Sequence, residues 1–153
     1  MPVELEAVLV GIVTAGSTLA AIWISDRTRI RTRWAAEQRG VIGRMLQTSE
    51  RAEEVMSTMG SHYQVQPQVD SFYAAWGEAQ LLVPKNLLRR AVDLRGAMTA
   101  LHNEFTVRVA YGDYANVGER KSFEERWAIA ERDVRKRRQA LVAAARSHFG
   151  LEA

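Results

Sequence analysis

The largest concentration of chemically active side chains in this chain is a basic run near the C-terminal end, RDVRKRRQ at residues 132–139. Its five cationic residues are Arg132, Arg135, Lys136, Arg137 and Arg138. On a helix they cover most of the circumference, and such a patch could bind phosphate groups of a nucleic acid or of acidic lipid. No nucleic-acid recognition motif accompanies the run. The favoured interpretation is therefore a solvated face, paired with acids such as Glu131 and Asp133 or in contact with acidic lipid, and nucleic acid is the less favoured partner.

Histidines and acids form no catalytic or metal-binding pattern. The histidines are His62, His102 and His148. None has a glutamate three residues upstream, as a di-metal bundle site requires, and the HExxH, phosphate-loop and GxSxG motifs are absent from the sequence. The pairs Glu53–Glu54 and Glu124–Glu125 are adjacent, so their side chains point in different directions from a helix and are expected to serve solvation. The sequence predicts a protein that is not an enzyme and holds no cofactor or metal.

The N-terminal part of the chain contains an uncharged run at residues 7–25, AVLVGIVTAGSTLAAIWIS. As a helix it is about 28 Å long, close to the ~30 Å hydrocarbon core of a bilayer. It predicts one membrane-spanning helix, with residues 1–6 on one side and 26–153 on the other. A cleaved signal peptide is less favoured, because Glu4 and Glu6 precede the run and no Lys or Arg does. A buried helix of a soluble domain is the other alternative.

The flanks of this run predict its orientation. Four arginines follow it closely: Arg27, Arg29, Arg31 and Arg33. The positive-inside rule then places the N-terminus outside the cell's inner (plasma) membrane and the C-terminus in the cytoplasm. The same arginines are expected to contact the anionic leaflet, at about 1 kcal/mol each. The absence of cysteine agrees with a cytoplasmic body.

Small residues inside the run predict contacts between such helices. Gly11, Ala15 and Thr18 share one helix face at the spacing that lets two membrane helices approach closely. Gly16 and Ala20 have a similar spacing. Either set of positions would allow the chain to form a homo-oligomer.

Residues 26–153 are enough for one domain with a core, and their apolar residues recur at helical spacing of three and four. The series are Ala35, Ile42, Met45, Ser49, Ala52, Met56 and Met59; Val69, Phe72, Trp76, Ala79 and Val83; Leu87, Ala91, Leu94, Met98, Leu101, Phe105 and Val109; and Phe123, Trp127, Ala130, Val134, Leu141, Ala145 and Phe149. No strand pattern is present. The expected fold is all-α, with an N-terminal transmembrane helix followed by an antiparallel three- to four-helix bundle.

Turn residues predict where these helices end. Gly60 is expected to stop the first helix, residues 61–68 to form a loop, and Pro84 to break or kink the next helix. A second loop is expected at residues 111–121. Ser122 and Glu125 would form the capping box of the last helix, which Gly150 would end.

The order of these features, with WAAEQR at residues 34–39, LLVP at 81–84 and AAARSHFG at 143–150, resembles a loose class of small proteins. These are uncharacterised bacterial proteins, especially actinobacterial and phage-borne ones, with one N-terminal span and a cytoplasmic helical body. Such proteins generally lack an assigned activity. The resemblance therefore implies the architecture and adds no site residues.

These observations favour a non-enzymatic, single-pass membrane-anchored scaffold whose helical bundle binds itself or a protein partner. The first alternative is a phage holin-like lesion protein that oligomerises through Gly11, Ala15 and Thr18. The second is a membrane-tethered nucleic-acid-binding protein that uses the basic run at residues 132–138.

Overall fold

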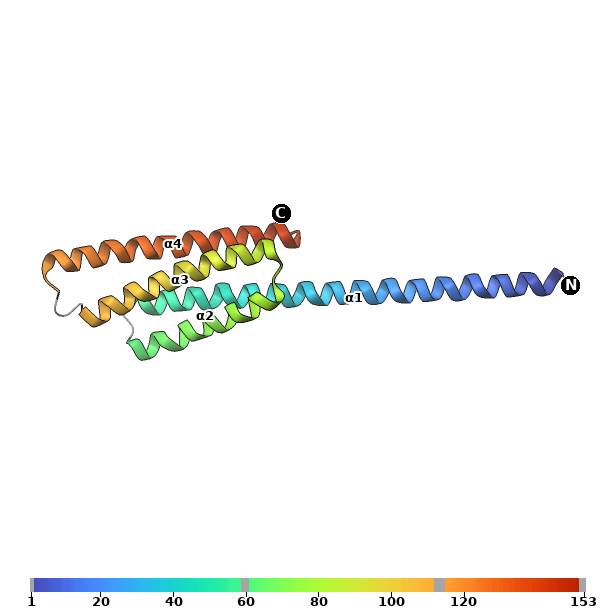
Figure 1. The fold of residues 1–153 in the computed structure, drawn as a ribbon, viewed down its shortest axis with the longest axis horizontal. Helices are drawn as coiled ribbons and strands as arrows, with labels where there is room; N and C mark the ends of the chain where they lie inside the picture. The colour runs from blue at the N-terminus through green and yellow to red at the C-terminus, as the bar shows by residue number, and fades with distance from the viewer. Residues whose placement is uncertain (1, 59–60, 112–114, 152–153) are drawn as a thin grey trace. The chain divides into compact units, whose positions relative to one another are not determined.

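The chain is all-α, as the sequence predicts. The computed structural model describes the backbone of residues 2–58, 61–111 and 115–151, and the side chains of these ranges from Ile24 onward. Its helices are α1 (Pro2–Ser57), α2 (His62–Leu82), α3 (Lys85–Tyr111) and α4 (Val117–Phe149), and the described residues contain no strand (Figure 1). The chain divides into two compact units, Met1–Glu37 and Gln38–Ala153.

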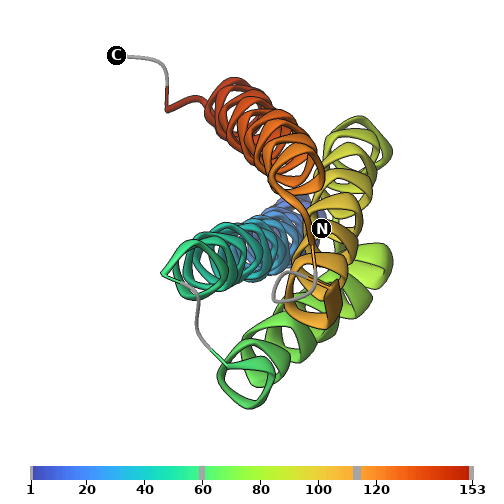
Figure 2. The same cartoon turned by 90° about the vertical axis from the view of Figure 1, so that its left-hand side faces the viewer.

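The second unit is an antiparallel four-helix bundle. The part of α1 that begins at Gln38 runs in one direction, α2 returns, α3 runs with α1, and α4 returns again (Figure 1). Along the bundle axis, α1 and α3 lie on opposite sides and each has α2 and α4 as neighbours (Figure 2). This arrangement confirms the predicted helical bundle.

Most of the bundle core consists of residues that the helical spacing selects, and Val41, Val65, Ala75 and Ala97 belong to it as well. Phe72, Leu94, Phe105 and Met45 are among its largest fully buried side chains. All predicted positions from Val69 to Phe105 in the two middle series are buried, whereas Val109 is exposed. In the last series Trp127, Val134 and Leu141 are buried and Phe149 packs against the core with part of its surface exposed. The predicted Met59 lies outside the described residues.

The predicted break at Pro84 is a complete chain reversal. Val83 has the extended conformation that a following proline favours, and its N–H still donates to the carbonyl of Ala79 at 3.0 Å. The Pro84 carbonyl accepts from the N–H groups of Leu87 and Leu88 at 3.0 and 2.8 Å, which starts α3. The helices before and after Pro84 are therefore separate, antiparallel members of the bundle.

The loop predicted at residues 61–68 is wrong, because α2 begins at His62. The backbone N–H of Ser61 donates to Gln64 Oε1 at 2.9 Å, as in a capping box. Val65 is fully buried. Pro67 lies in the second turn, where its missing N–H costs one helical hydrogen bond. Capping and burial outweigh that cost.

The capping box predicted at Ser122 and Glu125 is also wrong, because α4 begins six residues earlier. The Glu119 N–H donates to Asn116 Oδ1 at 3.0 Å, and the Asn116 N–H donates to Glu119 Oε2 at 2.9 Å. Asparagine is as good an N-cap as serine, so the first suitable pair starts the helix. Only residues 112–116 separate α3 from α4, and Ser122 Oγ instead accepts from Arg126 Nη1 at 2.9 Å.

The predicted end of α4 at Gly150 is confirmed. Gly150 has a φ of 64°, in the left-handed region where a Cβ is disfavoured. The N–H of Leu151 donates to the Arg146 carbonyl at 2.9 Å and closes the helix end.

The described residues of the first unit all belong to α1. Every described side chain from Ile24 to Trp34 is exposed. Within the described part of the chain, no helix is both long enough and apolar enough to cross a membrane. The predicted span at residues 7–25 lies almost wholly among residues whose side chains are outside the described set, as do Gly11, Ala15 and Thr18.

Candidate functional site

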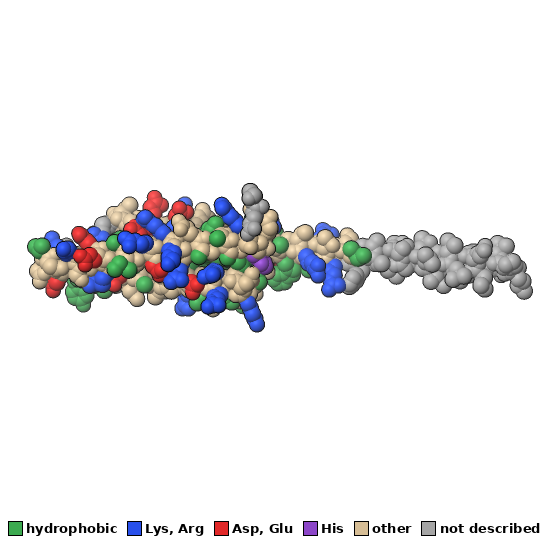
Figure 3. Space-filling view, turned by 90° about the horizontal axis from the view of Figure 1, so that it is seen from above, with side chains coloured by type: hydrophobic (Ala, Val, Ile, Leu, Met, Phe, Trp, Pro, Cys, Tyr) green, Lys and Arg blue, Asp and Glu red, His purple; other side chains and the backbone are tan. Residues whose placement is uncertain are grey.

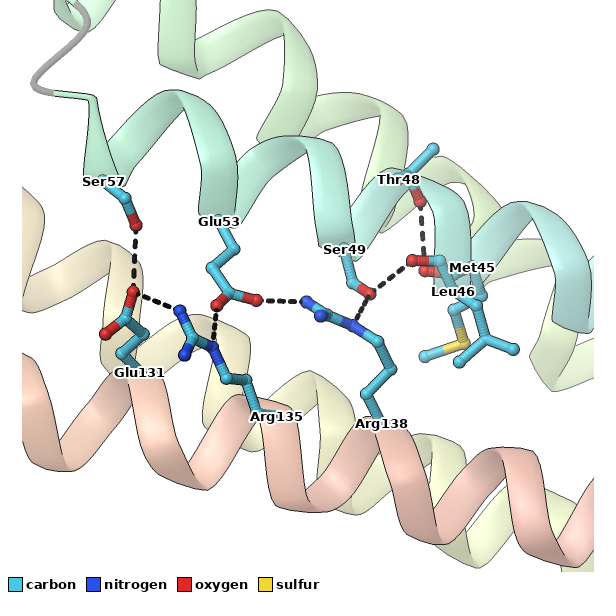
Figure 4. Close-up of polar contacts among 9 residues, drawn as sticks. All are labelled: Met45, Leu46, Thr48, Ser49, Glu53, Ser57, Glu131, Arg135 and Arg138. Carbon is cyan, nitrogen blue, oxygen red and sulfur yellow. Dashed lines mark hydrogen bonds and ion pairs between the residues drawn. The ribbon is translucent and has the colours of Figure 1, made fainter.

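A polar cluster joins α1 to α4 and extends from the core of the bundle to its surface. Ser49, Glu53 and Ser57 recur every four residues of α1, and Glu131, Arg135 and Arg138 recur at spacings of four and three in α4. Such spacings place each set on one side of its helix, and the two sides face each other (Figure 4). We call these six residues the Glu53 cluster.

Glu53 is the centre of this cluster. It is only 6% exposed, next to the buried core residue Ala52. Arg135 Nε donates to Glu53 Oε1 at 2.7 Å, and Arg138 Nη2 donates to Glu53 Oε2 at 2.5 Å (Figure 4). Burying a carboxylate is unfavourable unless cations and hydrogen bonds compensate it, and here each oxygen has a guanidinium donor. The expectation that Glu53 serves solvation is therefore wrong.

The remaining members extend the hydrogen-bond network. Arg138 Nε donates to Ser49 Oγ at 3.1 Å, and Ser49 Oγ donates to the Leu46 carbonyl at 2.7 Å. Arg135 Nη2 donates to Glu131 Oε1 at 2.9 Å, which also accepts from Ser57 Oγ at 3.1 Å. The hydrogen bond to Glu53, with the charges of Glu131 and Glu53, raises the pKa of Arg135 above its ordinary value.

The cluster borders an open hollow of about 700 Å³. Its lining consists of Glu50, Glu53, Glu54, Ser57, Thr58, Arg135, Arg138 and Gln139. Both oxygens of Glu53 are occupied by arginine donors, so this carboxylate is not placed to take a proton from a ligand. Two acids and two arginines also balance each other in charge. This arrangement can hold two helices in register, and it offers no acid–base pair for catalysis.

The basic run of α4 is divided among different partners. Arg135 and Arg138 bind Glu53, while Arg137 Nε lies 3.1 Å from Asp133 Oδ1 and its Nη1 lies 3.9 Å from Asp93 Oδ2 on α3. Arg132 and Lys136 are exposed and have no ion pair with any described residue. Figure 3, which views the molecule from the α4 side, shows basic and acidic side chains interleaved along the bundle. Three of the five cations are thus paired with acids of the bundle.

The arginines that follow the uncharged run have a different environment. Arg27, Arg29, Arg31 and Arg33 are all exposed on α1. At about 100° per residue, Arg27 and Arg31 lie on one side of the helix and the other two lie on the opposite side. Arg33 Nε is 3.3 Å from Glu37 Oε1, an exposed pair one turn apart.

A histidine with an unpaired nitrogen lies between α2 and α3. His102 Nε2 is buried and has no hydrogen-bond partner among the described residues. Burial lowers the pKa of His102, and the charge of His62 lowers it further, while Asp70 acts in the opposite direction. No motif in the sequence distinguishes His102 from the other two histidines.

Within the described residues, no group of three or more histidine, aspartate or glutamate side chains is arranged to hold a metal ion. No protein-family model, curated protein or solved structure matches this chain. Its function must therefore be inferred from its own residues.

Proposed function

We propose that this chain is a non-enzymatic, single-pass membrane-anchored scaffold. Residues 7–25 cross the inner membrane with the N-terminus outside, and the four-helix bundle lies in the cytoplasm. The observation that carries the proposal is the set of exposed arginines at residues 27–33, which begins one residue after Asp26 closes an uncharged stretch and occupies opposite sides of α1.

This distribution of charge distinguishes two ways of meeting a membrane. A helix that lies in the interface plane keeps its cations on one face and its apolar residues on the other. A helix that passes through the interface is surrounded by headgroups, so cations on both sides gain about 1 kcal/mol each near an anionic leaflet. Arg27 and Arg29 point in nearly opposite directions, which fits the second case.

The bundle supports a binding role rather than a catalytic one. Its core is closed by apolar side chains, and its one deeply buried carboxylate, among the described residues, is neutralised by Arg135 and Arg138. The nucleic-acid alternative receives less support, because three of the five cations of the basic run are engaged with acids of the bundle.

Membrane extraction and cysteine labelling test the proposal, and the chain has no native cysteine to interfere. We expect the full chain to resist alkaline carbonate extraction. Glu4→Cys should react with a membrane-impermeant maleimide in intact cells, whereas Leu151→Cys should react only after lysis. A full-length chain that carbonate releases would overturn the anchor.

A charge-reversal variant tests the arginines themselves. Replacing Arg27, Arg29, Arg31 and Arg33 with glutamate should invert or abolish the labelling pattern, because positive flanks set orientation. The matched control reverses four exposed cations of the bundle that have no ion pair with a described residue: Arg51, Lys121, Arg132 and Lys136. If both variants behave alike, the arginines next to the run do not determine topology.

A further inference from the structure

The segment of α1 at residues 24–37 carries large apolar side chains that nothing in the described chain covers. Ile30 is 56% exposed and Trp34 is 48% exposed, one helical turn apart on the same side. A single helix with exposed apolar residues is only marginally stable in water and gains stability by burying that face. This face therefore lacks a partner.

The shape of the face indicates what the partner is. Ile30, Arg33, Trp34 and Glu37 border a hollow of about 290 Å³. Their spacing of i, i+3, i+4 and i+7 gives the four corners of a hole that receives one side chain in knobs-into-holes packing of coiled coils. With Trp34 at heptad position a, Ile30 and Glu37 are d residues and Arg33 is a g residue. In a parallel pair of helices in register, these four residues surround the a residue of the other helix.

We propose that two copies of this chain pack in parallel and in register along residues 26–37, with Trp34 of each copy inserted into the hollow of the other. The parallel direction agrees with the proposed membrane anchor, on which this part of the inference rests, since both N-termini would enter one membrane. Confinement to that membrane also raises the effective concentration of the second copy.

One pair of opposite charges in the segment is brought together in this arrangement. Asp26 is at position g and Arg31, five residues later, is at position e. In a parallel pair, g of one helix meets e of the next heptad on the other helix, so each Asp26 faces Arg31 of the second copy. An antiparallel pair brings e against e and places Arg31 beside Arg31.

The packed segment is short, which sets its strength. Arg27 at position a and Glu37 at position d also lie on the seam, where each faces the same residue of the second copy. Such polar seam residues fix register at a cost in stability. The next a position is Val41, which is buried in the bundle core and cannot contribute. The dimer therefore depends on only a few layers, and the membrane assists it.

Disulfide cross-linking of the full chain in membranes tests this proposal. Ile30→Cys and Trp34→Cys lie on the seam, whereas Thr32→Cys and Ala36→Cys lie on the far side of the same helix. After mild oxidation we expect the two seam variants to form disulfide dimers at least about fivefold faster than the two controls. Cross-linking at both seam positions requires a parallel pair, because an antiparallel crossing can align only one of them.

A second variant distinguishes cross-linking that depends on helix packing from cross-linking by random encounters in the membrane. Trp34→Ala, added to Ile30→Cys, should return the dimer yield to the level of the Thr32→Cys control, because it removes the inserted side chain. Equal cross-linking at all four positions, or a seam disulfide to a different protein, would overturn the dimer. Carbonate extraction of the same samples is read separately: membrane-bound chains without the seam pattern refute the dimer alone, whereas extractable chains refute the anchor.

Discussion

Glu53 on α1 and Arg138 on α4 form an ion pair of 2.5 Å across 85 residues of sequence, and both side chains are largely withdrawn from solvent. Arg135 completes the arrangement from the more exposed side. Removing one partner of a buried ion pair leaves an uncompensated charge and lowers the stability of the fold. The pair therefore favours the packing of α1 against α4.

Glu53→Gln should destabilise the bundle strongly, because it leaves two guanidinium groups without their shared carboxylate. Breaking a buried pair costs about 3–5 kcal/mol, and we expect the lower end because Arg135 is more than half exposed. Urea unfolding of the detergent-solubilised chain, followed by circular dichroism, measures the change. Glu54→Gln, one residue away and exposed, is the control and should change stability by less than ~0.5 kcal/mol. Equal effects of the two variants would show that Glu53 is not a special position.

The burial of His102 predicts that acid weakens the bundle. Its pKa is ordinarily 6.5 and is lower in the folded chain, so the unfolded chain binds the proton more readily. Stability should therefore fall as the pH drops below about 6.5, until the folded pKa is reached. Melting temperatures between pH 7.5 and pH 5 measure this slope. His102→Gln should flatten it, whereas His148→Gln, on the exposed side of α4, should not; a slope unchanged by His102→Gln refutes the assignment.

Two glycine substitutions should act in opposite directions. Gly150→Ala forces a Cβ into a left-handed conformation at the end of α4 and should cost about 1 kcal/mol. Gly43→Ala, in the regular part of α1, meets no atom within 4 Å and should stabilise by about 0.5–1 kcal/mol through its helix propensity. Thermal unfolding of both variants provides the comparison. Stabilisation by Gly150→Ala would contradict the helix end described above.

The start of α4 can be tested at its cap. Asn116→Ala removes the acceptor of the Glu119 N–H and should cost about 1 kcal/mol. Ser122→Ala, at the position that the sequence suggested for the cap, should cost less than ~0.5 kcal/mol, because this side chain only accepts a bond from Arg126. Amide hydrogen exchange of residues 117–121 should also accelerate in Asn116→Ala. The reverse order of the two costs would place the cap at Ser122 after all.

The apolar periodicity of the sequence predicted the helical segments and most of their core, but it missed Val65, which was assigned to a loop. Phe72, Leu94 and Leu141 follow the helical period, and each is buried. The helix starts were harder, because Pro67 and the glycines near residue 115 suggest loops, whereas the caps that decide the boundaries are single polar residues. Local spacing does not reveal which of several such residues will cap a helix.

The Glu53 cluster could not be predicted from periodicity alone. A period identifies the side of a helix on which a residue lies, but it does not identify a partner 82 or 85 residues away. One signal was present: Ser49 falls in the predicted apolar series, and Glu53 is one turn further along the same side. A polar residue and an acid at core positions would have suggested a buried cation from another helix.

The two-residue link at Val83 and Pro84 sets an order of assembly for the bundle. It joins α2 and α3 as a hairpin whose contacts are close in sequence, whereas contact between α1 and α4 must close a loop of more than 80 residues. We expect the α2–α3 hairpin to form first, and α1 to be the helix that separates most readily from the folded bundle. Hydrogen exchange should then be faster at the amides around Glu53 than at those around Leu94. The contact between α1 and α4 would then be the last to form during folding and the first to be lost during unfolding.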